Sequence, residues 1–179
     1  SVPVPPFDGS EDYTVSPDGK SIVYVAKQKY GLQFAESTNT DLFQFDIETD
    51  KTTNLTEGMM GYDKNPSFSP DGKYLAFLGS RGVDKDTKNQ VWTLDLRGGE
   101  AVQFTNVPQG INSFHWSPDG TKMALVIKDA KQLNNASDEN SANEKLEPFV
   151  IDRLQFKKDY VGYLDRRRTH IYIKNGHEK

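Results

Sequence analysis

The pentapeptide SPDGK at residues 16–20 returns unchanged at residues 69–73, and as SPDGT at residues 117–121. The proline presets φ for a turn, the aspartate suits the next position, and the glycine accepts the positive φ that comes after it. The three serines, Ser16, Ser69 and Ser117, are expected to cap the turn by hydrogen bonding to backbone amides. Each copy therefore predicts a tight hairpin between two strands, and the spacing of about fifty residues indicates a repeat architecture.

The segments around each turn repeat as well. Each copy is followed by an apolar run, at residues 22–25, 75–78 and 123–126, that is too short for a helix. An uninterrupted apolar run is typical of a strand covered on both faces. Further strand-like segments lie at residues 42–46, 91–95 and 171–173, and Asn54-Leu55-Thr56 matches Gln103-Phe104-Thr105. Each unit therefore contains a strand, the SPDG hairpin, a second strand, a loop, a third strand, a short turn and a fourth strand.

This order of elements predicts an all-β fold, a partial β-propeller of about three four-stranded antiparallel blades. The expected blades are residues 10–56, 62–105 and 110–179, the last incomplete and carrying a polar insertion at 128–148. Asn175-Gly176 is a hairpin signal, and the sequence stops where the fourth strand of that blade should begin. We therefore expect a fragment of one propeller domain with an open blade edge, which either pairs with another copy or was left by proteolysis.

The repeat resembles the WD-like propeller units whose consensus is a W-S-P-D-G-K turn followed by an apolar strand and a leucine-threonine pair. The segments that carry this resemblance are residues 114–120 and 54–56. Such units occur in TolB-like proteins and in the propellers of the prolyl oligopeptidase family of serine peptidases. The resemblance covers nearly the whole chain and implies a propeller fold.

The segment VIDRLQFKKDYVGYLDRRRTHIYI at residues 150–173 resembles a stretch in the propellers of acylaminoacyl-peptidase-like members. The matching positions are Val150, Asp152, Arg153, Phe156, Lys157, Asp159, Gly162, Tyr163, Asp165 and His170. Tyr160 departs from this pattern, where a glycine is expected. Because TolB lacks this segment, the resemblance favours a peptidase propeller, and residues 36–43 and 61–77 also look like propeller sequence of bacterial dipeptidyl or acylaminoacyl peptidases.

The residues that would carry catalysis are missing from this sequence. The family places its nucleophile on a G-x-S-x-G elbow, and the nearest stretch, Gly79-Ser80-Arg81-Gly82, lacks that spacing and is interpreted as a loop. His115, His170 and His177 show no pairing typical of a zinc site or a catalytic base. Asp84 and Asp86 fail the calcium-loop pattern. No catalytic, cofactor-binding or metal-binding residue is therefore assigned, and no cofactor is expected.

Composition narrows the class of partner. The chain has 179 residues, 35% hydrophobic and 27% charged, with a net charge of −4 and no cysteine. The negative charge argues against nucleic acid as a partner, and no apolar run approaches the roughly eighteen residues of a membrane span. The absence of cysteine excludes a disulfide scaffold but is compatible with a periplasmic, secreted or cytoplasmic location.

The resemblance implies the substrate-gating propeller portion of a serine-type peptidase that hydrolyses short peptides, without its C-terminal hydrolase domain. This chain alone is then not catalytic, and its expected partners are that hydrolase domain and, through it, peptide substrates. The alternative is a TolB-like propeller that binds other proteins without catalysis.

Overall fold

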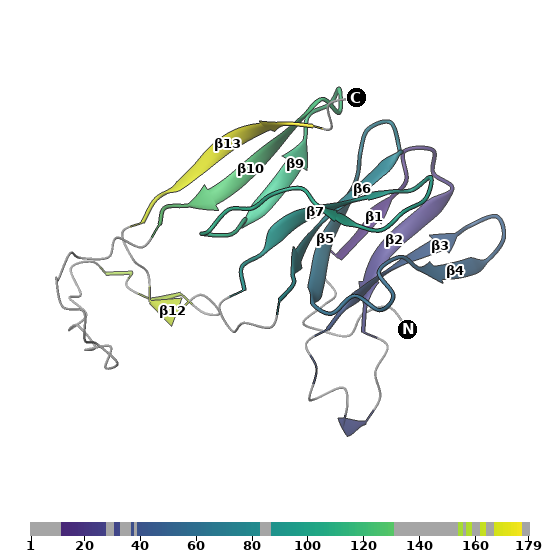
Figure 1. The fold of residues 1–179 in the computed structure, drawn as a ribbon, viewed down its shortest axis with the longest axis horizontal. Helices are drawn as coiled ribbons and strands as arrows, with labels where there is room; N and C mark the ends of the chain where they lie inside the picture. Colours follow the sequence, from purple (N-terminus) through teal and green to yellow (C-terminus); the bar gives the residue numbers. More distant parts are fainter. Residues whose placement is uncertain are drawn as a thin grey trace.

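A computed structural model describes residues 12–27, 31–32, 37, 39–82, 87–130, 154–155, 157–158, 162–163 and 167–176. All named elements within these residues are β-strands (Figure 1). The first sheet contains β1 (Tyr13–Val15), β2 (Ser21–Ala26), β3 (Asp41–Asp46) and β4 (Lys51–Asn54). The second contains β5 (Tyr62–Phe68), β6 (Tyr74–Ser80), β7 (Gln90–Asp95) and β8 (Val102–Gln103). The third contains β9 (Ser113–Trp116), β10 (Lys122–Lys128) and β13 (Thr169–Asn175).

The three sheets share one topology. In the first two sheets the strands are hydrogen bonded in chain order, and the third has the order β13-β10-β9. All pairs are antiparallel, so each SPDG turn joins the first two strands of its sheet. The sheets lie side by side in chain order in Figure 1. This arrangement confirms the predicted all-β partial propeller.

A separate small hairpin of β11 (Lys157–Lys158) and β12 (Gly162–Tyr163) lies within the 150–173 segment. The peptidase-like positions 150, 152, 153, 156, 159 and 165 lie outside the described residues, as do residues 131–148 of the predicted insertion. Lys128, the first residue of that insertion, belongs to β10.

The SPDG turns have the same hydrogen bonds in all three copies. In the first, Ser16 Oγ accepts a 2.9 Å hydrogen bond from the backbone N–H of Ser21 and donates one of 2.6 Å to Asp18. Gly19 N–H donates to the Ser16 carbonyl at 2.9 Å. The equivalent bonds are present at Ser69 and Ser117. The predicted serine caps are therefore confirmed, and the three turn glycines have φ of 72°, 71° and 69°.

Apolar side chains between the sheets form two clusters. One joins the first and second sheets, and its buried members are Val23, Val25, Leu42, Phe68, Leu75, Phe77 and Leu94. The other joins the second and third, and its buried members are Ala76, Leu78, Val91, Ile111, Phe114, Met123, Leu125 and Ile127. Strand β6 contributes to both clusters, as expected for a strand covered on both faces. Strands β2 and β10 instead alternate between buried and partly buried residues over their apolar runs, so the prediction of coverage on both faces is wrong for them.

The segments Leu55-Thr56 and Phe104-Thr105 close the first two sheets. Thr56 Oγ1 accepts a hydrogen bond from Leu42 N–H at 3.0 Å, and Thr105 Oγ1 accepts one from Val91 N–H at 2.9 Å. Both threonines are buried, at 1% and 4% exposure. The side-chain hydroxyl therefore replaces a backbone partner just beyond the last strand, which explains why threonine recurs there.

Candidate functional site

Consecutive SPDG turns lie against one another at one end of the sheets. A Cβ atom added to Gly120 would stand 3.3 Å from Cδ of Pro70, and one added to Gly72 would stand 3.7 Å from Cδ of Pro17. The proline of each turn therefore contacts the glycine of the next. This close approach, together with the positive φ, explains why the turn sequence is repeated so strictly.

A concave surface lies between the second and third turns, and is here called the turn groove. It encloses about 780 Å³. Its lining residues are Ser69, Asp71, Lys73, Tyr74, Arg97, Trp116, Asp119, Gly120, Thr121, Lys122, Asn175 and Gly176. Most of the lining residues carry polar or charged groups, but apolar atoms make up the larger share of the lining surface, so the lining does not favour a polar over an apolar ligand.

Charges in and beside the turn groove are paired locally. Arg97 Nη2 lies 2.6 Å from Oδ2 of Asp95, and its guanidinium carbon lies 5.6 Å from the centre of the Tyr74 ring. Lys73 Nζ lies 3.0 Å from Oδ2 of Asp71. Positive and negative side chains alternate along the groove. The groove therefore offers hydrogen-bonding groups, but no excess of positive or negative charge that would select an anion or a cation.

Hydrogen bonding within the turns fixes the charge state of their aspartates. The Ser117 hydroxyl, the Thr121 backbone amide and the Thr121 hydroxyl lower the pKa of Asp119 to about 2. The Ser16 hydroxyl, and after it the Lys20 backbone amide, likewise lower the pKa of Asp18. Donors aimed at a carboxylate stabilise its ionised form. These aspartates are structural anions and not proton carriers.

A buried ion pair within the second sheet lies at its junction with the first sheet. Arg81 Nη2 lies 2.9 Å from Oδ2 of Asp63, with side-chain exposures of 11% and 2%. The guanidinium carbon lies 4.4 Å from the centre of the Trp92 ring and 5.2 Å from that of Phe77. Arg81 Nη1 also contacts the Met59 sulfur at 2.7 Å. The arginine is therefore held by a carboxylate and by two aromatic rings, an environment that its planar charge suits.

Two local features position Asp63. Strand β5 has a register shift between Lys64 and Ser67, and Asn65 there has a φ of 53°. The extra residue of this bulge shifts the alternation of the strand, so the buried positions are Asp63, Pro66 and Phe68. Across the strand pair, a Cβ on Gly79 would come within 2.8 Å of Asp63 Oδ1. The bulge and the glycine together make room for the carboxylate.

The surroundings of Asp63 belong to both sheets. Thr40 Oγ1 donates a 2.7 Å hydrogen bond to the Asp63 carbonyl, and Gly61 N–H donates to Asn39 Oδ1 at 2.6 Å. Burial raises the pKa of Asp63, against the opposing effects of hydrogen bonds from Arg81 and Thr56. Thr40 and Thr56 flank strands of the first sheet, so Asp63 is hydrogen bonded both within its own sheet and to the neighbouring one.

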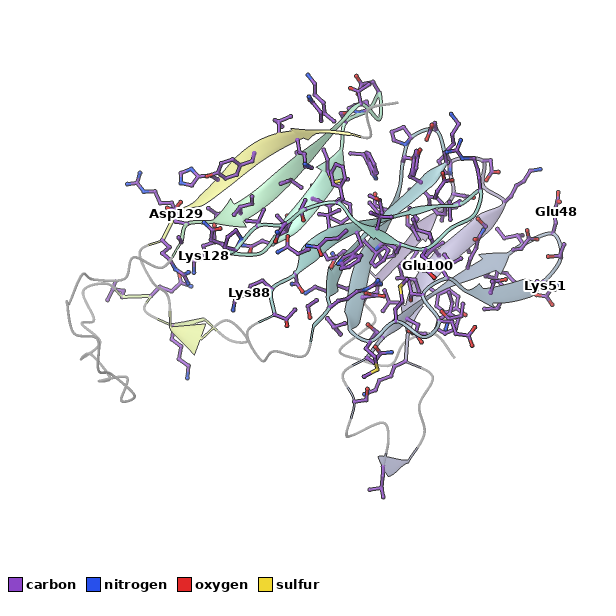
Figure 2. All side chains as sticks on the ribbon, viewed as in Figure 1. Glu48, Lys51, Lys88, Glu100, Lys128 and Asp129 are labelled. Carbon is purple, nitrogen blue, oxygen red and sulfur yellow. The ribbon has the colours of Figure 1, made fainter. Side chains whose placement is uncertain are left out.

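The residues considered as catalytic candidates are not brought together. His115 lies in β9 and His170 in β13. His170 Nε2 lies 3.1 Å from Oδ1 of Asp129, which comes directly after β10 and is labelled in Figure 2. Gly79 and Ser80 belong to strand β6, so the prediction of a loop over residues 79–82 is wrong for its first half. His177, Asp84 and Asp86 lie outside the described residues.

Within the part of the chain that the structure describes, no group of three or more histidine, aspartate or glutamate side chains is arranged to hold a metal ion. None of the described helical residues forms a segment long and apolar enough to cross a membrane.

The Asp63–Arg81 pair is not predicted by the sequence pattern. A glycine directly after an apolar strand run, as at Gly79, signals a close approach in a sheet and was the available clue. The bulge at Asn65 that aims Asp63 inward has no such signal in the sequence, because asparagine and proline also occur in ordinary turns.

The strand order and the repeated turns define a partial β-propeller built from SPDG units. No known family profile matches the chain. Dipeptidyl-peptidase 5 of Porphyromonas gingivalis is 36% identical to it over 133 residues, 72% of this chain and 19% of that protein. Dipeptidyl-peptidase 5 of Porphyromonas endodontalis is 52% identical over 75 residues, 42% of this chain and 11% of that protein. The chain thus spans about one tenth to one fifth of the length of these relatives.

Solved structures agree on the fold. A putative TolB from Agrobacterium tumefaciens matches 64% of this chain and 37% of its own, with 31% identity and a TM-score of 0.50. The acylaminoacyl peptidase of Pyrococcus horikoshii matches 87% of this chain and 21% of its own, with 19% identity and a TM-score of 0.59. The chain is therefore similar in sequence to part of the dipeptidyl-peptidase 5 proteins and in fold to TolB and acylaminoacyl peptidase, which confirms the resemblance predicted from the motifs.

Proposed function

We propose that this chain is the substrate-gating propeller portion of a serine-type peptidase of the acylaminoacyl- or dipeptidyl-peptidase kind, which hydrolyses short peptides. The observation that carries the proposal is the 36% identity to a dipeptidyl-peptidase 5 over 72% of the chain. Bond cleavage is assigned to an α/β-hydrolase domain outside residues 1–179, and that domain is the expected partner of this propeller.

The chemistry of the described residues supports a role in selection. Asp63 and Arg81 are saturated by protein partners, and the turn groove is lined by locally paired charges. Hydroxyl groups that lie beside carboxylates, such as Ser16, Ser69 and Ser117, belong to the SPDG turns and hold those turns together. This structural role supports steric restriction of the substrate as the task of this region.

A second candidate is a TolB-like propeller that binds proteins without catalysis. It is favoured by the 31% identity to a putative TolB structure over 64% of the chain. The two candidates differ in the sequence expected downstream of residue 179. The peptidase requires a G-x-S-x-G elbow there, with a later aspartate and histidine, and the TolB-like protein does not.

Reading the coding sequence beyond residue 179 is the first test, and absence of the elbow would favour the TolB-like candidate. The second test assays the longer polypeptide and the 179-residue chain on dipeptidyl and acyl-aminoacyl p-nitroanilides. We expect hydrolysis by the longer polypeptide alone, abolished when the elbow serine is replaced by alanine. Activity of the 179-residue chain by itself would contradict the proposal.

Gating is tested separately in the longer polypeptide. We expect it to cleave dipeptidyl p-nitroanilides but to leave a folded protein intact. A variant lacking the propeller, provided that it still hydrolyses the small substrate, should gain cleavage of long unfolded peptides. An unchanged ratio of long-peptide to small-substrate rates would refute the gating role while leaving the peptidase assignment standing.

A further inference from the structure

Each SPDG turn contains an Asp-Gly peptide bond whose aspartate is exposed to solvent. The three pairs are Asp18-Gly19, Asp71-Gly72 and Asp119-Gly120. Aspartate rearranges to isoaspartate most readily before glycine, because glycine has no side chain to hinder attack by its own backbone nitrogen. The Asp71 side chain is 49% exposed, so burial does not protect it from this reaction.

The rearrangement has two chemical requirements. The glycine nitrogen gives up its proton and attacks the aspartate Cγ, a C–N bond forms, and a carboxyl oxygen leaves as water, which gives a cyclic imide. Water then opens the imide at either carbonyl and yields aspartate or isoaspartate, without oxidation or reduction. The carboxyl must be protonated for its oxygen to leave as water, and the nitrogen must be free to release its proton.

The hydrogen bonds of the second turn oppose both requirements. Gly72 N–H donates to the Ser69 carbonyl at 2.9 Å, so its proton is held in a backbone hydrogen bond. The Asp71 carboxylate accepts a 2.7 Å hydrogen bond from the Ser69 hydroxyl and one of 3.2 Å from the Lys73 N–H. The serine hydroxyl is the main cause that lowers the pKa of Asp71. Because donors aimed at a carboxylate favour its ionised form, the oxygen that would leave is kept as part of an anion.

The same contacts are present in the other two turns. Gly19 N–H donates to the Ser16 carbonyl and Gly120 N–H to the Ser117 carbonyl, each at 2.9 Å. The hydroxyls of the two serines donate to the neighbouring aspartates at 2.6 Å. Chiefly through the Ser117 hydroxyl, the pKa of Asp119 falls from 3.8 to about 2. This shift lowers the protonated fraction of Asp119 at neutral pH by about tenfold or more.

We propose that the serine of each SPDG turn protects the adjacent Asp-Gly bond from isoaspartate formation, so that the three aspartates are modification sites that become reactive only when their turn opens. Isoaspartate adds one carbon to the backbone of the turn. A Cβ added to Gly120 would stand only 3.3 Å from Pro70 Cδ, so this contact leaves little room for a longer backbone. The modification would therefore disturb the packing of consecutive turns.

The second turn offers the most direct measurement, because trypsin cleavage after Lys64 and Lys73 releases residues 65–73, in which Asp71 is the only aspartate. The full polypeptide is kept at neutral pH and physiological temperature, and isoaspartate in this fragment is quantified by mass spectrometry with electron-transfer fragmentation. A synthetic peptide of the same residues gives the unprotected rate. We expect the folded chain to form isoaspartate at Asp71 about tenfold more slowly than the peptide, or slower still. Equal rates would overturn the proposal.

Replacing single turn serines tests whether the protection comes from the hydroxyl. Ser69→Ala should raise the rate at Asp71 about tenfold and leave Asp119 at its wild-type rate, and Ser117→Ala should do the reverse. Ser69→Thr keeps the hydroxyl and should keep the slow rate. Circular dichroism shows whether each variant is folded, and the two alanine variants are independent, so loss of the fold in one leaves the other as the test. An unchanged rate beside the missing hydroxyl, or an equal rise at both sites of a folded variant, would contradict protection by the adjacent serine.

Discussion

The two interfaces between the sheets share their apolar packing but differ in polar content. The interface of the first and second sheets buries the ion pair of Asp63 and Arg81 beside its apolar cluster. The interface of the second and third sheets has an apolar cluster and, as a polar addition, a 3.4 Å hydrogen bond from Trp116 Nε1 to the Ser67 carbonyl. The repeated sequence therefore determines the packing of sheet on sheet, while the polar contacts are particular to each junction.

The difference originates in one strand. Strands β1 and β9, which come first in the first and third sheets, pair with their neighbours in continuous register. Strand β5, which comes first in the second sheet, instead has the bulge at Asn65. The bulge places a carboxylate in the interface, and the carboxylate then requires a buried cation. Removing two charges from water costs several kcal/mol, so a pair of this kind fixes the relative placement of two elements more than it adds stability.

The largest expected effect comes from leaving one charge of the junction unpaired. Arg81→Ala removes the partner of Asp63 and exposes the aromatic faces of Trp92 and Phe77. We expect a loss of about 3–5 kcal/mol in the free energy of unfolding, because the Asp63 carboxyl stays buried without its cation. Urea unfolding followed by tryptophan fluorescence measures this change.

The matched control is the double variant Asp63→Asn/Arg81→Met, which removes both charges and keeps most of the volume. It should be destabilised less than Arg81→Ala alone, since no unpaired charge remains in the interface. If both variants lose the same stability, the arginine acts through packing on the rings and the two interfaces do not differ electrostatically.

A smaller effect is expected at the threonines that close the first two sheets. Thr56→Val and Thr105→Val each leave a buried backbone N–H without its acceptor, at Leu42 and Val91 respectively, which costs about 1–3 kcal/mol. Thr56 also hydrogen bonds the Asp63 carboxylate, whereas Thr105 donates to the neutral Gln90 side chain at 2.9 Å.

Hydrogen bonds to charged groups are the stronger ones, so Thr56→Val should cost more than Thr105→Val. Thermal unfolding of both variants gives the order. Serine at either position keeps the hydroxyl and should recover most of the loss. Equal costs, or a larger one at Thr105, would show that the charged junction is no stronger than the neutral one.

The fold was predictable because its signals are local and repeated. A turn such as Ser69-Pro70-Asp71-Gly72 has few structural alternatives, and the apolar run after it can only be a strand. The same reasoning was wrong about coverage of β2 and β10, because burial on a second face depends on which sheet stands beside the strand. That information is not contained in the run itself.

The Asp63–Arg81 pair was not predictable for a related reason. The two residues are brought together by a register shift in β5 and by the space at Gly79, and neither changes the pattern of apolar residues. From the sequence pattern alone, Asp63 is predicted to be exposed to solvent, since most aspartates are exposed. Only the paired register of β5 and β6 shows that its side chain faces the neighbouring sheet.

The smallest expected effect is a difference in pH dependence between Asp63 and the turn aspartate Asp119. Burial raises the pKa of Asp63 above its ordinary value of 3.8, so the folded chain holds this proton more tightly than the unfolded chain. The contribution of Asp63 to stability is therefore greatest below pH 3.8 and declines as the pH rises through its folded pKa. Asp119 behaves oppositely, because its pKa is lowered to about 2 and its contribution is lost as the pH falls from 3.8 towards that value.

Urea unfolding between pH 2 and pH 6 separates these two contributions. The stability difference between wild type and Asp119→Asn should shrink as the pH falls below 3.8, since protonation already removes the charge that the turn donors stabilise. The difference between wild type and Asp63→Asn should instead shift in favour of wild type as the pH falls, because the protonated carboxyl no longer carries a buried charge. Parallel profiles for the two variants would mean that the buried Asp63 titrates like an exposed turn aspartate, which would contradict the raised pKa of Asp63.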